Sequence, residues 1–431
     1  MEKIKRTLTT GSNAGFVIRV GGNLISFLLQ VMLARLLGVE SYGDYIYVIT
    51  LVNILHIFGK VGFDRSSLRF IPSYQINEQC SLTKGFLLQS NKITLLCSVS
   101  LSIVSLIIIW LLHGSIRSDL IALLGLASIL LPLKSFSVMT YAKIQAFKHV
   151  VLSQFLQLIL EPLILGVLVL ICFLVAQAYF NAKAALVINI TATFVVTIVA
   201  LGYLRRYISK ELFDISPSFK TSEWMKVSFI LSLTIGFNLI LQETDVIMIG
   251  MIQDTTESGI YKAAQRVSHL LRFGLIAINA IVAPLIAESF AANQMDQLQY
   301  ISTFATRRMS AIAIFVCILL VFWGDKILAL FGNEFQSAYV VLLVLGVGQI
   351  VNAFAGPVGV IMGMTNNQNF SLYLTVFSAV VNVALNYLFI NLYGIIGAAI
   401  ATSITLSFWN ITQALVVRRR LGVNPTIFVR N

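Results

Sequence analysis

Residues 151–176 read VLSQFLQLILEPLILGVLVLICFLVA, an apolar run in which Glu161 is the one charged residue. A transmembrane helix needs about 20 mainly apolar residues, whereas a transmembrane strand needs about ten. Because backbone N–H and C=O groups cannot stay unpaired in hydrocarbon, this run predicts an α-helix that crosses a bilayer. Pro162 follows Glu161 in the middle of the run and predicts a kink, since proline removes a helical hydrogen bond.

Similar runs occur along all 431 residues of the chain. Hydrophobic residues make up 58% of the sequence and charged residues 11%, whereas about a quarter of a soluble domain is charged. The first run is too long for the core of a signal peptide and is interpreted as an uncleaved span. The sequence therefore predicts an all-α integral membrane protein with about 12 transmembrane helices, near residues 14–37, 44–63, 85–112, 119–141, 151–176, 184–204, 226–251, 260–287, 309–324, 337–362, 370–391 and 395–417.

The formal net charge of +12 is explained by the distribution of lysine and arginine between the loops, without a nucleic-acid partner. If the chain starts in the cytoplasm, 18 basic residues of the termini and loops fall inside, and three fall outside: Arg117, Lys183 and Lys326. Cytoplasmic loops carry the excess of basic residues in membrane proteins. Both termini are therefore predicted to be cytoplasmic.

The two halves of the chain show traces of a duplication. LLGVESYGDYIYVITLVNIL (36–55) and IQDTTESGIYKAAQRVSHLL (252–271) align at an offset of 216, which superposes Gly43 on Gly259 and Tyr45 on Tyr261. This offset pairs each span with the sixth span after it, so the halves share one orientation. We expect an N-terminal six-helix lobe (1–204), a cytoplasmic linker (205–225) and a C-terminal six-helix lobe (226–431), arranged around a central cationic cavity.

Four stretches of the sequence carry a resemblance to a known family: the turn LLGVESYGDY after the first span, TDVIMIG at the end of the seventh, GIYKAAQRV at the start of the eighth and the basic loop after the second. They resemble the polysaccharide-transporter branch of the MOP (multidrug, oligosaccharidyl-lipid and polysaccharide) exporters, which have a MATE-like fold. This branch includes the Wzx-type O-antigen flippases. The resemblance implies flipping of undecaprenyl-pyrophosphate-linked oligosaccharide, for O-antigen of lipopolysaccharide or a related surface polysaccharide, across the bacterial inner membrane by alternating access. It also implies a polysaccharide polymerase and a chain-length regulator as partners.

Span eight carries an unusual number of basic residues for a membrane helix. Lys262, His269 and Arg272 fall on one helix face with Gln265 and Asn279, and Arg266 lies at its margin. Arginine binds phosphate oxygens through a planar fork, so we interpret this face as the wall of a wet cavity that receives pyrophosphate. The alternative is that lysine snorkels to the membrane surface and the arginines brace neighbouring helices.

Span seven ends beside the start of span eight, so Asp245 and Arg266 are expected at the same depth and predicted to pair. Asn238, Gln242 and Asp245 form a polar stripe on span seven, which is typical of sugar-contacting or gating residues and also of packing between helices.

The first half contains a corresponding set of polar residues. Span two carries Asn53, His56 and Lys60 on one face, and Arg19 lies on a polar stripe of span one. We predict that Arg19, His56 and Lys60 contribute to the pyrophosphate cavity, although Arg19 and Lys60 also suit anchoring at the membrane surface. Glu161 is predicted to carry a coupling proton or to pair with an arginine of the cavity.

No catalytic or metal-binding pattern emerges from the sequence: it has four histidines, no CxxC pair, no P-loop and no GxSxG motif. A transporter without a cofactor is expected, coupled to an H⁺ or Na⁺ gradient, rather than an enzyme. The second hypothesis is an ion-coupled multidrug antiporter, whose cationic substrates would require carboxylates in the cavity. A membrane scaffold is the third hypothesis, but it would not require polar stripes on several spans.

Overall fold

The computed structural model describes residues 2–114, 116–207 and 215–428, which form helices joined by short turns. Among the described residues, ten helices are long and apolar enough to cross a membrane. Two of these, Val17–Lys60 and Gln368–Leu421, are long enough to cross it twice. The predicted all-α, multi-pass membrane architecture is confirmed.

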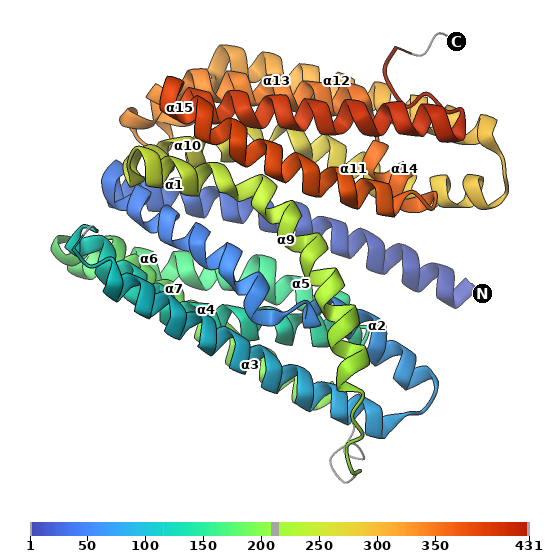
Figure 1. The fold of residues 1–431 in the computed structure, drawn as a ribbon, viewed down its shortest axis with the longest axis horizontal. Helices are drawn as coiled ribbons and strands as arrows, with labels where there is room; N and C mark the ends of the chain where they lie inside the picture. Colours follow the sequence, from blue (N-terminus) through green and yellow to red (C-terminus); the bar gives the residue numbers. More distant parts are fainter. Residues whose placement is uncertain (1, 115, 208–214, 429–431) are drawn as a thin grey trace. The chain divides into compact units, whose positions relative to one another are not determined.

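A single glycine reverses the chain in each of the two longest helices. Helix α1 (Glu2–Lys60) turns back at Gly38, where φ is 74° and ψ is 169°, and α15 (Gln368–Leu421) turns back at Gly394, where φ is 61° and ψ is −141° (Figure 1). Side chains other than hydrogen rarely tolerate this backbone geometry. Counting each hairpin as two spans, the ten long helices supply the twelve expected spans.

The chain divides into two compact units, Met1–Gly236 and Phe237–Asn431. In order, the helices of the first unit are α1, α2 (Phe63–Ile76), α3 (Cys80–Leu111), α4 (Ser118–Ala146), α5 (Val150–Phe155), α6 (Glu161–Ala176), α7 (Ala182–Tyr207) and the first part of α9 (Thr221–Ile252). The second unit contains the rest of α9, α10 (Thr255–Ser268), α11 (Leu271–Ala291), α12 (Met295–Ala329), α13 (Tyr339–Ala355), α14 (Val358–Met364) and α15.

The unit boundary lies inside α9, beyond the polar segment 205–225 that the sequence favours as the linker. The described end of that segment packs onto the first unit. Ser218 donates its backbone N–H to Ser81, and Trp224 is fully buried against Phe86. The Trp224 indole also donates a hydrogen bond of 2.8 Å to the Tyr74 hydroxyl. Residues 208–214 of the predicted linker lie outside the described residues.

The kink predicted at Pro162 takes the form of a wide helical turn. Residues Leu156–Leu160 adopt a π-helical turn between α5 and α6, immediately before Glu161 and Pro162. Pro162 has no N–H to donate to the carbonyl of Leu158, and a π-turn accommodates such a gap. Gly22 of α1 packs on this turn, where a Cβ would lie 2.7 Å from that carbonyl oxygen.

Candidate functional site: a polar cavity in the second unit

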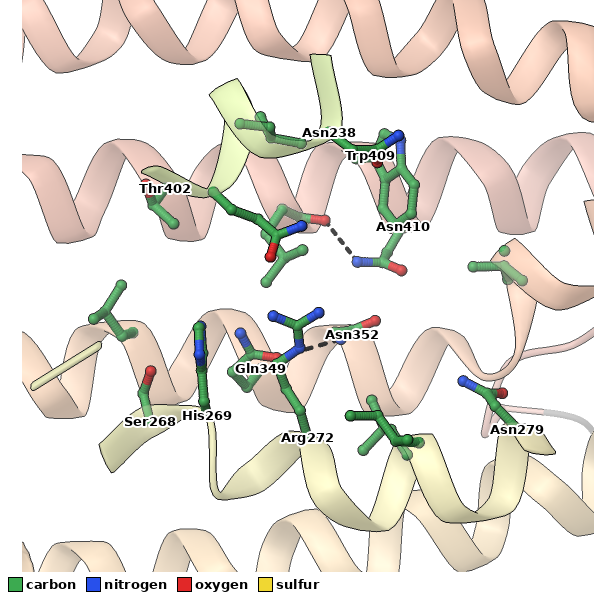
Figure 2. A pocket seen from close by; sticks show the side chains of 18 of the residues that line it. Asn238, Ser268, His269, Arg272, Asn279, Gln349, Asn352, Thr402, Trp409 and Asn410 are labelled. Carbon is green, nitrogen blue, oxygen red and sulfur yellow. Dashed lines mark hydrogen bonds between the residues drawn. The ribbon is translucent and has the colours of Figure 1, made fainter. Parts of the chain in front are cut away.

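The second unit contains a cavity of about 330 Å³ whose wall is formed by α9, α10, α11, α13, α14 and α15 (Figure 2). Amides and hydroxyls supply most of its polar lining, from Asn238, Gln242, Gln265, Ser268, Asn279, Gln349, Asn352, Asn382, Thr402 and Asn410. His269 and Arg272 are its basic residues, and none of the described residues that line it is acidic. The cavity is therefore suited to a ligand that is anionic and rich in hydrogen-bonding groups.

Arg272 extends from the first turn of α11 into this cavity, with His269 beside it and Gln349 and Asn352 of α13 flanking it (Figure 2). Within the described part of the chain, no hydrogen bond or ion pair engages the Arg272 guanidinium. Gln265 also lines the cavity, and its buried Oε1 has no partner among the described residues. A donor and an acceptor thus remain available to a ligand.

A break in the helix, which the sequence did not indicate, gives this wall its shape. Span eight was predicted as one continuous helix, but α10 ends at Ser268 and α11 begins at Leu271. Leu270 donates its N–H to Val267, and Arg272 to His269, so two tight i→i−3 bonds span the break. The predicted polar face survives it, because Gln265, His269, Arg272 and Asn279 all line the cavity.

Lys262 does not line this cavity. Its ammonium group is buried and forms an ion pair with Glu243 of α9. Arg266 is half-buried outside the cavity lining, and its buried Nε has no hydrogen-bond partner among the described residues. Of the four basic residues assigned to pyrophosphate on this span, the structure thus brings His269 and Arg272 together in the cavity.

The predicted ion pair between Asp245 and Arg266 is wrong. Asp245 is fully buried and accepts hydrogen bonds from Tyr261 at 2.6 Å, Thr402 at 2.6 Å and Asn386 at 2.7 Å. All three donors are neutral, so counting embedded charges gave no signal for them: Tyr261 lies on span eight, Asn386 on span eleven and Thr402 on span twelve. Thr402 is part of the cavity wall, so the carboxylate lies directly behind that wall.

In the first unit, the predicted residues of span two are engaged by local partners. The Lys60 ammonium lies 2.9 Å from the Asp64 carboxylate, and both side chains are buried. His56 is half-buried, with its Nδ1 3.2 Å from the Val52 carbonyl oxygen, and Asn53 is half-buried one turn earlier. Arg19 of span one is exposed; with the Gln154 amide turned to suit its neighbours, Gln154 accepts a hydrogen bond of 2.9 Å from Arg19.

Glu161 pairs with a lysine rather than with an arginine. Its carboxylate lies 2.6 Å from the Lys134 ammonium and accepts hydrogen bonds from Tyr141 at 3.1 Å and Thr193 at 3.2 Å. Lys134 of α4 thus compensates a buried acid. The structure places this cluster beside the π-helical turn.

Sequence reasoning overlooked the side of the cavity that α13 and α15 contribute. The polar residues on this side lie within apolar runs that carry no charge, so embedded charge did not indicate them: Gln349, Asn352, Asn382, Trp409 and Asn410. Amides are also costly in hydrocarbon, so their recurrence in spans ten to twelve was a usable signal.

The chain matches the polysaccharide biosynthesis protein family over residues 10–290 and the MatE family over residues 231–388. It is 26% identical over 406 residues to Agl15 of Haloferax volcanii, described as a probable low-salt glycan biosynthesis flippase, covering 93% of this chain and 81% of that protein. It is also 26% identical over 186 residues to AglR of the same organism, described as a probable flippase, covering 42% of this chain and 39% of that protein.

Among solved structures, a multidrug resistance MATE family transporter of the MOP superfamily, in its inward-facing conformation, shares the fold with a TM-score of 0.78 and 15% identity. The match covers 94% of this chain and 98% of that one. A MOP superfamily transporter from Pyrococcus furiosus gives a TM-score of 0.62 at 16% identity, with 95% and 94% covered. The family match spans well over half of the sequence, and the fold agrees with it: the chain belongs to the polysaccharide biosynthesis protein family, the polysaccharide-transporter branch of the MATE-like MOP exporters.

Proposed function

We propose that this protein is a flippase for lipid-linked glycans, and that the cavity of the second unit binds the diphosphate and the adjoining sugar of its substrate. The observation that carries this proposal is the Arg272 guanidinium, which lies in the cavity without a partner among the described residues. A half-buried cation in a cavity wall without a compensating charge favours an anionic ligand. A diphosphate offers the bidentate oxygens that a guanidinium binds best.

The rest of the cavity lining favours a carbohydrate next to that anion. Trp409 and Asn410 of α15 lie across the cavity from Arg272 and Asn352 (Figure 2). An indole offers an apolar face to the ring of a sugar, and amides both donate to and accept from its hydroxyls. Among the described residues, Gln265 Oε1 and Asn279 Oδ1 have no hydrogen-bond partner, and we propose them as acceptors for two such hydroxyls.

The charge of the cavity argues against a multidrug antiporter, the alternative that the MATE-like fold also suits. A cationic drug would meet Arg272 and no lining carboxylate among the described residues. By Coulomb's law, two like charges about 4 Å apart repel by about 4 kcal/mol at an effective dielectric constant of about 20. This repulsion favours an anionic substrate over a cationic one.

We further propose that the protein lies in a bacterial inner membrane, with both termini in the cytoplasm. It would there carry undecaprenyl-pyrophosphate-linked repeat units of O-antigen or a related surface polysaccharide to a polymerase and its chain-length regulator. The basic cytoplasmic loops predicted from the sequence and the resemblance to the Wzx-type flippases support this form of the proposal.

We also propose that Asp245 couples transport to an H⁺ or Na⁺ gradient. Its carboxylate is fully buried, and the residues that donate hydrogen bonds to it, Tyr261, Asn386 and Thr402, are neutral. Uptake of one proton or one sodium ion would neutralise this charge, and hydroxyl and amide oxygens suit a hard cation. Because Thr402 belongs both to this cluster and to the cavity wall, a change at Asp245 would reach the bound substrate.

The cavity proposal is tested by Arg272→Ala. We expect the loss of surface glycan and the accumulation of lipid-linked repeat units on the cytoplasmic side, with normal amounts of folded protein in the membrane. Loss of a charge-assisted pair costs about 2–3 kcal/mol, or about 30- to 150-fold in affinity for the diphosphate. Arg272→Lys should retain part of the activity, since it keeps the charge and loses the fork.

Arg308→Ala serves as the matched control, because Arg308 is exposed on α12 and lies over the Phe304 ring, outside the cavity. It should leave surface glycan unchanged. Normal glycan in the Arg272→Ala strain would remove Arg272 from the binding site. A strain that lacks this protein provides a further test. If it loses drug resistance but keeps its surface glycan, the antiporter would be favoured instead.

A further inference from the structure

The last described residues of the chain fold back onto the second unit beside its cavity. Gly422 ends α15 with φ of 71°, and the segment Val423–Phe428, here called the C-terminal strap, then runs along α12 and the end of α13. Val423 is buried in an apolar cluster with Ile286, Leu298 and Met362. This strap is therefore packed structure rather than a loose end.

Three side-chain and main-chain contacts fasten the strap. Gln299 of α12 forms two hydrogen bonds with the backbone of Asn424. Its Nε2 donates to the Asn424 carbonyl at 2.8 Å, and its Oε1 accepts from the Asn424 N–H at 2.7 Å. Thr306, two turns further along α12, donates to the Pro425 carbonyl at 2.6 Å. Finally, the Ile427 N–H donates to the Phe354 carbonyl at 3.0 Å.

The strap meets the cavity wall at the break between α13 and α14. Helix α13 ends at Ala355, and its last turn leaves the Phe354 carbonyl without a partner within the helix, which the strap supplies. At Gly356, where φ is 83°, a Cβ would lie 2.1 Å from the Thr306 hydroxyl and 2.4 Å from the Pro425 carbonyl oxygen. Gly356, Pro357, Val358, Gly359 and Val360 all line the cavity.

We propose that the C-terminal strap holds the α13–α14 wall in place, and that its release opens the cavity at that end. Gln299, Thr306 and Pro425 are then positioning residues, which touch no ligand and act through Gly356 and α14. Helix α14 has seven residues and packs through Ile361 and Met362, whereas the Gly356–Pro357 turn before it is fixed mainly by the strap. A segment fixed by a few hydrogen bonds opens at low free energy, and each lost bond shifts that opening measurably. This opening of the α13–α14 wall does not depend on which ligand the cavity binds.

Thiol accessibility tests this role in the full-length, detergent-solubilised protein, with its four cysteines replaced by serine. A Val360→Cys reporter on α14 is labelled with a maleimide, and the rate is compared in Thr306→Val and Thr306→Ser backgrounds. Valine has the shape of threonine but cannot donate to Pro425, whereas serine keeps the donor. We expect Thr306→Val to raise the labelling rate about fivefold, the factor that corresponds to about 1 kcal/mol for one hydrogen bond. Thr306→Ser should stay near the parent rate.

A second reporter separates local opening from general loosening. Ser268→Cys lies at the other end of the cavity from Asn279 (Figure 2), and its labelling rate should not change in Thr306→Val. Gln299→Glu, which removes the donor to Asn424, should reproduce the effect of Thr306→Val. Unchanged labelling at Val360→Cys in both variants, or an equal rise at both reporters, would overturn the proposal. Because the labelling rate involves no glycan, a failure of the strap proposal can be distinguished from a failure of the flippase assignment.

Discussion

At the scale of single residues, the buried pair of Lys262 and Glu243 separates a structural cation from a ligand-binding one. We expect Glu243→Gln to destabilise the protein by about 3–5 kcal/mol, because the Lys262 ammonium would remain buried without compensation. The double variant Glu243→Gln with Lys262→Met should recover most of this loss. Thermal unfolding in detergent, followed by tryptophan fluorescence, measures both effects.

The control for this prediction is Glu223→Gln. Glu223 is 4.0 Å from Lys220, and both side chains are more than half exposed, so the loss should be within about 1 kcal/mol. Equal unfolding temperatures for the Glu243→Gln variant and the parent would contradict the structural role of Lys262. Loss of surface glycan in a fully stable Lys262→Met variant would return Lys262 to the ligand site.

The roles of charged residues were the least predictable part of the site. Counting residues along the spans predicted that Asp245, Glu161 and Lys262 lie at some depth in their helices, and the structure buries all three residues. Counting could not identify their partners, because these are set by the rotation of each helix and by distant segments. Asp245 pairs with Asn386 and Thr402, which are more than a hundred residues away, and Glu161 pairs with Lys134 of the preceding span.

At the scale of elements, the hairpin at Gly38 provides a direct test of backbone strain. Its φ of 74° and ψ of 169° lie in a region that is occupied almost only by glycine, while no side chain of the described residues lies within 4 Å of a Cβ built there. Gly38→Ala should therefore cost about 1–3 kcal/mol through the backbone alone. Gly21→Ala, in the same helix and equally unobstructed, should be neutral or stabilising. Thermal unfolding of both variants checks this pair, and equal effects would contradict the strain argument.

Element positions followed closely from the apolar runs, because the cost of an unpaired backbone in hydrocarbon leaves helices as the available solution. Interruptions within spans were harder to predict. Pro162 signalled the π-helical turn before it, whereas the break at His269 and Leu270 contains neither glycine nor proline. Local sequence therefore gave no signal for that break.

At the scale of the whole molecule, the coupling role of Asp245 is the property most open to test. In Asp245→Asn, we expect a folded protein that flips lipid-linked glycan at a rate independent of imposed pH or Na⁺ gradients, because asparagine cannot exchange charge. Flipping of a fluorescent polyprenyl-diphosphate-linked N-acetylglucosamine in proteoliposomes would measure this. Asp296→Asn, at an exposed position of α12, is the control that should keep the gradient dependence. An unchanged dependence in Asp245→Asn would exclude Asp245 as the coupling residue.

Fold class and family were predictable at this scale, because composition, span count and a few turn motifs all point to them. The two six-helix lobes and the linker stay predictions; the structure divides the chain into two compact units whose boundary lies inside α9. The polar segment 205–225 was the natural place for a linker, yet its described end packs against the core of the first unit through Trp224. A polar composition indicates that a segment is exposed to water, but it does not by itself show that the segment is a flexible linker.

The glycine hairpins also constrain how the polypeptide is made. At Gly38 and Gly394, a single non-helical residue separates two helices, so the connection between the two spans of each hairpin is very short. We expect the two helices of such a pair to leave the translocation channel and enter lipid together. Biogenesis therefore involves fewer independent insertion steps than there are membrane crossings, and a charge placed in one member of a hairpin would endanger the topology of both.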